Sequence, residues 1–144
     1  MPMLVYFEPV SQLFNGLVKF HSGKDHVVLR YVDKDSKEWT DISWATFKSR
    51  VHAMAGYLYS QGVRPGDRVA ILSENRPEWA YTDMATQLLG GTNVSLYTTL
   101  PSNEVSYIIH DSQACVFIVS TGIQLKKALQ IYDLCPHLNK IVSM

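Results

Sequence analysis

Residues 68–79 read RVAILSENRPEW, and this stretch sets the fold of the chain. The run RVAILS (68–73) is short and apolar and contains β-branched residues, which is typical of a strand covered on both faces. Pro77 suits the first turn of a helix, because it needs no amide proton there and its φ is already helical. Glu78 adds a favourable negative charge at the helix start. A buried strand that leads directly into a helix indicates a βα unit.

The same alternation continues toward the C-terminal end. The helix from Pro77 ends at the Gly90-Gly91 pair, and the later segments are a strand at 92–96, a helix opened by Pro101-Ser102, a strand at 114–120, a helix over about 122–134 and a strand at 140–144. Strands that alternate with helices imply right-handed crossovers between parallel strands. The sequence therefore predicts the α/β class, with a layered, largely parallel sheet and helices on both faces, in the manner of Rossmann-like or flavodoxin-like folds.

Three elements are expected before this stretch. Apolar residues recur at helical spacing from Glu8 to Phe20, and Gly23 ends that helix. The runs VVLRYVD (27–33) and WTDIS (39–43) flank the polar turn DKDSK, so they predict a small hairpin. Ser43 is then a good N-cap for a long helix that ends at Gly62.

Composition indicates one globular unit over residues 1–144. The chain is 47% hydrophobic, and its 13 basic and 13 acidic residues cancel, so net charge gives no reason to expect nucleic-acid binding. The first residues lack the pattern of a signal peptide, and no apolar run is long enough to span a membrane. Cys115 and Cys135 lack the spacing of a zinc site or a disulfide framework. We therefore expect a soluble, cytoplasmic protein.

The last predicted strand, KIVSM, has no helix after it, so we expect the chain to be part of a longer protein. Such a chain would leave apolar surface from VFIV (116–119) and KIVS (140–143) poorly protected. This predicts self-association. The contact could be the one through which the longer protein forms a homodimer, or it could arise because the rest of that protein is absent.

Candidate site residues follow the strands, because open parallel sheets bind ligands at the carboxyl ends of their strands. They are Ser73, Glu74 and Asn75; Tyr97, Thr98 and Thr99; and Ser120, Thr121 and Gly122. No Gly-x-Gly-x-x-Gly or Walker pattern follows any strand. The segment STGIQLKK (120–127) could meet a phosphate, but an ordinary loop and a solvated helix face explain it as well. The histidines are scattered and predict no metal site, and Glu78 fits a helix start better than a catalytic pair with Glu74.

The ordered motifs resemble a known family. RVAILSENRPEW followed by LLGGTNVSLYTTLPSNEVSYIIHDS (88–112) is similar to the N-terminal part of AMP-forming acyl-CoA synthetases, and most similar to the long-chain fatty acid branch. The resemblance covers about residues 10–143. It implies a ligase that uses ATP and Mg²⁺ to convert a fatty acid to an acyl-adenylate and then transfers the acyl group to coenzyme A.

The resemblance also limits what this chain does alone. In the family the ATP loop, the adenine and ribose contacts and the catalytic lysine come after the region present here, so the chain is expected to be inactive scaffold with no bound cofactor. By position in the family, Thr98, Thr99, Lys126 and Lys127 are candidates to approach coenzyme A. The resemblance is also compatible with a protein that binds to the surface of a membrane. The alternatives are another carboxylate-activating ligase of this superfamily, or a free-standing flavodoxin-like binding module.

Overall fold

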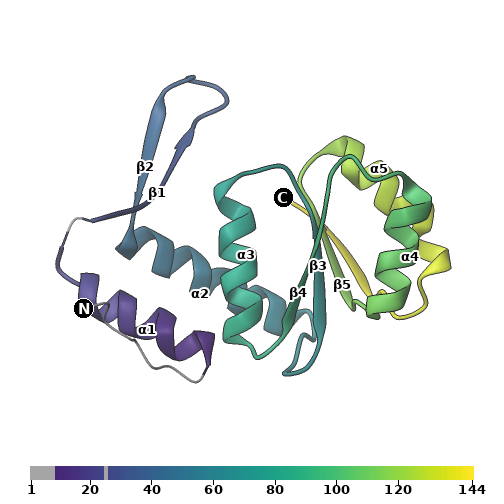
Figure 1. The fold of residues 1–144 in the computed structure, drawn as a ribbon, viewed down its shortest axis with the longest axis horizontal. Helices are drawn as coiled ribbons and strands as arrows, with labels where there is room; N and C mark the ends of the chain where they lie inside the picture. The colour runs from purple at the N-terminus through teal and green to yellow at the C-terminus, as the bar shows by residue number, and fades with distance from the viewer. Residues whose placement is uncertain (1–8, 25) are drawn as a thin grey trace, which may run out of the picture.

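The computed structural model describes residues 9–24 and 26–144, which form the elements drawn in Figure 1. The expected helix start at Glu8 lies outside the described residues. In chain order the elements are α1 (Val10–His21), β1 (Val27–Val32), β2 (Trp39–Ser43), α2 (Trp44–Ser60), β3 (Arg68–Leu72), α3 (Pro77–Leu88), β4 (Thr92–Leu96), α4 (Ser102–Ser112), β5 (Val116–Val119), α5 (Gly122–Ile131), the 3₁₀ turn η1 (Tyr132–Leu134) and β6 (Lys140–Ser143).

The main sheet has four parallel strands in the order β4-β3-β5-β6. Ala70 of β3 pairs with Val94 on one side and with Phe117 on the other, so β3 lies inside the sheet. Each crossover between neighbouring parallel strands contains a helix, as the sequence predicts. The α/β prediction is confirmed.

Helices cover both faces of this sheet, with α1, α2 and α3 on one side and α4 and α5 on the other (Figure 1). Successive strand residues point to opposite faces, so Phe117 packs in the α4/α5 core while Ile118 packs in the core on the α1/α2/α3 side. Two covered faces explain why the strand sequences are continuous apolar runs and do not alternate with polar residues.

The strands β1 and β2 form a separate antiparallel sheet that projects away from the main one (Figure 1). Its tip is ordered by Asp33, whose Oδ1 accepts hydrogen bonds from the backbone amides of Asp35 at 3.0 Å and Ser36 at 2.9 Å. At its base, the Ser43 hydroxyl accepts a hydrogen bond from the Thr46 amide at 3.2 Å. The predicted hairpin and the predicted N-cap of α2 are both confirmed.

Two expectations about the C-terminal elements need correction. The helix expected over about 122–134 is α-helical only to Ile131 and then tightens into η1. The apolar run VFIV is also fully buried, because β3 and β6 pair with β5 on its two sides and helices cover its faces. Incomplete cover falls on the two edge strands, which have a partner on one side only: β6 is half-buried at Ile141 and Val142, and β4 is exposed at Thr92 and Ser95.

Among the described residues, no helix combines the length and the apolar character that a membrane crossing needs.

Candidate functional site

Three loops meet at the carboxyl end of the main sheet. The strands β4, β3 and β5 are neighbours, so the segments that follow them leave the same edge side by side (Figure 1). The contacts below show that Glu74, Thr98 and Ser120, one from each segment, are linked directly or through α5. The candidate residues that follow these three strands therefore lie at one edge of the sheet.

Glu74 is the centre of this junction. One of its carboxylate oxygens accepts a short hydrogen bond from the Ser120 hydroxyl, and the other accepts one from the Gln124 side-chain amide at 3.2 Å. Burial pushes the pKa of Glu74 upward, but these hydrogen bonds and one from its own backbone amide outweigh burial, so the pKa lies below its ordinary value. Glu74 is therefore ionised at neutral pH and acts as an acceptor of hydrogen bonds, which does not suit a general acid.

Arg76 ties the start of α3 to the end of β5. Its Nε donates to Glu78 at 2.7 Å, and its Nη1 donates to the backbone carbonyl of Ser120 at 3.0 Å. Burial raises the pKa of Glu78, but the hydrogen bond and charge of Arg76 lower it below its ordinary value. Glu78 lies in the first turn of α3 and is paired with a cation, so the interpretation of Glu78 as a helix-start residue is confirmed.

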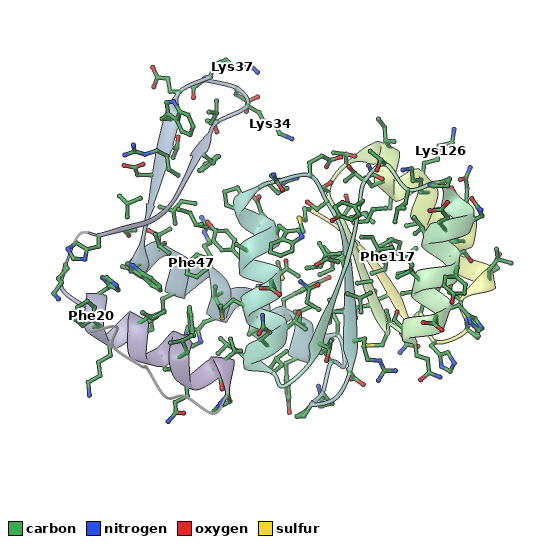
Figure 2. All side chains as sticks on the ribbon, viewed as in Figure 1. Phe20, Lys34, Lys37, Phe47, Phe117 and Lys126 are labelled. Carbon is green, nitrogen blue, oxygen red and sulfur yellow. The ribbon has the colours of Figure 1, made fainter. Side chains whose placement is uncertain are left out.

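The two candidate lysines on α5 lie in different surroundings. The Lys127 ammonium donates to the backbone carbonyls of Thr98 at 2.7 Å and Leu100 at 2.9 Å. Lys126 is exposed, makes no hydrogen bond or ion pair with any described residue, and extends away from α5 in Figure 2. Thr99 is also exposed. The structure thus brings Lys127 and Thr98 together and leaves Lys126 and Thr99 facing solvent.

The segment STGIQLKK begins α5 with a capped end. The Thr121 hydroxyl accepts a hydrogen bond from the Gln124 amide at 3.4 Å, so one of the amides that a phosphate would use already has a partner. The charge of Lys127 is directed at backbone carbonyls. Both contacts favour the ordinary-loop interpretation of this segment over a phosphate cradle.

A groove of about 620 Å³ lies between the hairpin and the start of α3. It is lined by Leu29, Arg30, Tyr31, Val32, Asp33, Lys34, Asp35, Trp39, Asn75, Arg76, Pro77, Glu78 and Ala80. Lys34, at the hairpin tip in Figure 2, is close enough to contribute to the lowered pKa values of Glu74 and Glu78. Sequence reasoning missed this groove, because its two walls are far apart in the chain and no motif links them.

The histidines are not all scattered, which corrects the sequence interpretation. The Nδ1 atoms of His21 and His26 lie 2.8 Å apart, and the His21 ring stacks on Trp44 with centroids separated by 4.8 Å. Burial, His26 and Lys24 lower the pKa of His21. Across residues 9–24 and 26–144, no group of three or more His, Cys, Asp or Glu side chains could hold a metal ion.

The fold and this edge define an α/β protein whose loops converge at the carboxyl ends of parallel strands, where sheets of this kind bind ligands. Comparison with known families makes the class specific. Residues 19–143 match the AMP-binding enzyme family, and the chain belongs to this family. Membership supports the synthetase interpretation over a free-standing flavodoxin-like module.

Two relatives illustrate the similarity in sequence. The long-chain-fatty-acid–CoA ligase FadD15 of Mycobacterium bovis is 32% identical over 106 residues, which are 74% of this chain and 18% of that protein. The long-chain-fatty-acid–CoA ligase ACSBG1 of Rattus norvegicus is 34% identical over 109 residues, or 76% of this chain and 15% of that protein. The chain thus spans less than a fifth of the length of these relatives.

Solved structures of related ligases have the same fold. The coronafacic acid ligase of Pectobacterium brasiliense aligns with a TM-score of 0.82 at 23% identity, over 95% of this chain and 26% of that one. The anthranilate CoA ligase AuaEII, solved with anthranoyl-AMP, aligns with a TM-score of 0.81 at 22% identity, over 98% of this chain and 26% of that one. At these identities the likeness establishes the fold alone.

Proposed function

We propose that residues 1–144 are the N-terminal part of the adenylation domain of a long-chain fatty acid CoA ligase. The observation that carries the proposal is the identity of 32% to 34% with FadD15 and ACSBG1 across about three quarters of the chain. The whole protein would use ATP and Mg²⁺ to form an acyl-adenylate from a fatty acid. The thiol of coenzyme A would then displace AMP.

The described residues do not themselves fit ATP or Mg²⁺. No Gly-rich phosphate loop occurs in the sequence, and the described part of the chain holds no cluster of metal ligands. We therefore derive no chemical step from these residues. Their role in the proposal is to build the sheet and hold its loops in place. We further propose a cytoplasmic ligase, with contact at a membrane surface and self-association through the edge of β6 as its two candidate interactions.

A second candidate function is a ligase for a different acid. The coronafacic acid and anthranilate ligases share this fold, which indicates that the scaffold is compatible with acids that are not long-chain. The shared fold does not by itself select the acid. The choice between the two candidates therefore depends on an assay with several acids.

The proposal is tested with the full-length protein that carries this chain. Purified protein is incubated with ATP, Mg²⁺, coenzyme A and one acid at a time, namely palmitate, acetate, benzoate or an amino acid, and acyl-CoA and AMP are quantified. We expect palmitate to give the highest kcat/KM, by at least about tenfold, which is 1.4 kcal/mol of transition-state discrimination. A preference for acetate or benzoate would replace the long-chain proposal with the second candidate. No AMP release with any acid would contradict both.

A separate prediction concerns coenzyme A. Replacing Lys126 and Lys127 together with alanine in the full-length ligase is expected to raise the KM for coenzyme A about tenfold, because the change removes the exposed charge of Lys126 and the contacts of Lys127 with the loop after β4. Pyrophosphate exchange, which reports adenylate formation, is expected to stay unchanged. An unchanged KM would remove these lysines, together with Thr98 and Thr99, from the proposed approach to coenzyme A.

A further inference from the structure

The loop of residues 97–100, which follows β4, is held by side chains from α5. Lys127 donates to the carbonyls of Thr98 and Leu100, and the Gln124 amide also reaches the Thr98 carbonyl, at 3.4 Å. Within the loop, the Leu100 amide donates to the Tyr97 carbonyl at 3.1 Å, which makes a turn. The loop is thus fixed from its α5 side.

Gln124 connects this loop to Glu74. It is 4% exposed, and its side-chain nitrogen donates both to the Glu74 carboxylate at 3.2 Å and to the Thr98 carbonyl. Reversing the amide would place its oxygen against two acceptors, so the chemistry of its neighbours fixes the orientation. The Gln124 Oε1 is then buried and finds no partner among the described residues. A buried amide held in this way links the two loops, because rotating its side chain breaks the hydrogen bonds to both.

The contacts place one anion, one neutral bridge and one cation in a row. Glu74 lies at one end, Gln124 in the middle and Lys127 at the other end, with the Thr98 carbonyl accepting from the last two. Charge-assisted hydrogen bonds are stronger than neutral ones, so both ends of the row are well anchored. The outer side of the loop stays uncovered, since Tyr97 is 81% exposed.

We infer that Glu74, Gln124 and Lys127 form a clamp that fixes the 97–100 loop at the strand ends, so that Lys127 is a positioning residue for this loop and Lys126 alone is free to contact coenzyme A. The second part rests on the proposed function, and the first does not. Lys127 has two of its three donors engaged with backbone, whereas Lys126 has none. Neighbouring lysines on one helix thereby have different roles.

The clamp is tested by amide hydrogen exchange in the full-length protein. Lys127→Met keeps a long apolar stem but removes the two hydrogen bonds, and we expect the Leu100 amide, which donates to the Tyr97 carbonyl within the loop, to exchange about tenfold faster. Lys127→Arg restores donors to both carbonyls, so it is expected to restore slow exchange. Lys126→Met is the matched control and should leave exchange in this loop unchanged.

Glu74→Gln supplies a second variant, because it removes the charge at the other end of the row while keeping the size of the side chain. We expect it to accelerate exchange of the Leu100 amide as well, although this residue lies on a different loop from Glu74. Unchanged loop exchange in both Lys127→Met and Glu74→Gln would overturn the clamp. Neither measurement requires enzymatic activity, so the result stands even if the ligase proposal fails.

Kinetics with coenzyme A distinguish whether Lys127 positions the 97–100 loop or contacts coenzyme A directly. Lys126→Met is expected to raise the KM for coenzyme A without any change in loop exchange. Lys127→Met should raise that KM only together with faster exchange, and Lys127→Arg should reverse both effects. A Lys127→Met protein with a raised KM and a loop as well protected as before would assign Lys127 to direct contact and contradict the inference.

Discussion

The purified 144-residue chain, incubated with ATP, Mg²⁺, palmitate and labelled pyrophosphate, is expected to transfer no label into ATP. Adenylate formation needs placed donors for the triphosphate and groups that stabilise charge on the α-phosphate. The sequence contains no Gly-rich phosphate loop, and two of the cations near the strand ends are already engaged, Arg76 with Glu78 and Lys127 with backbone carbonyls. The loss relative to the full-length protein is expected to be complete within the sensitivity of the assay.

The full-length protein is the positive control for this experiment. It should exchange label readily and release AMP once coenzyme A is added. Exchange by the isolated chain at a rate above that of a heat-denatured sample would show that residues 1–144 contain an ATP site. It would therefore contradict their assignment as scaffold.

Much of the fold could be predicted because its signals are local. Pro77 and Glu78 mark the start of α3, and Ser43 caps α2 with its own hydroxyl. The Gly90 that ends the α3 segment has φ of 73°, a left-handed conformation that glycine adopts without strain. Each of these features depends on a few neighbouring residues, and the continuous apolar runs between them report burial on both faces of the sheet.

The organisation of the site could be predicted only in part. The rule about strand ends placed Glu74, Thr98 and Ser120 among the residues that follow strands, and the structure brings these three to one edge of the sheet. Their partners follow from side-chain packing between residues far apart in the chain, since Glu74 meets Gln124 across 50 positions and Lys127 meets Thr98 across 29. No local pattern distinguishes Lys127 from Lys126. Their different contacts depend on the direction in which each side chain leaves α5.

The prediction that VFIV (116–119) is poorly protected was wrong for a related reason. The sequence shows that 116–119 is apolar but gives no strand order, and an edge strand and an interior strand of this composition look alike. In the order β4-β3-β5-β6, the segment β6 pairs with β5 and removes the exposed edge. Long-range pairing therefore decides which strands lie at an edge of the sheet, and local composition does not.

The interior position of β5 leads to a prediction about stability. Phe117 is 0% exposed and lies between Ala70 of β3 and Ile141 of β6 in the register of the sheet. Phe117→Ala would leave a cavity in the α4/α5 core, and substitutions of this kind cost about 3–5 kcal/mol. Because total stabilities are typically about 5–15 kcal/mol, the variant is expected to lose a large part of its free energy of unfolding.

Urea unfolding followed by circular dichroism measures this effect. The midpoint for Phe117→Ala should fall strongly, whereas Phe117→Leu, which refills most of the volume, should lose less. Tyr107→Ala is the matched control, because Tyr107 is an aromatic residue on α4 that is 70% exposed, and its removal should change stability by less than about 0.5 kcal/mol. Equal losses for Phe117→Ala and Tyr107→Ala would contradict the burial of Phe117 in the α4/α5 core, because truncating an aromatic side chain is inexpensive only where that side chain is accessible to solvent.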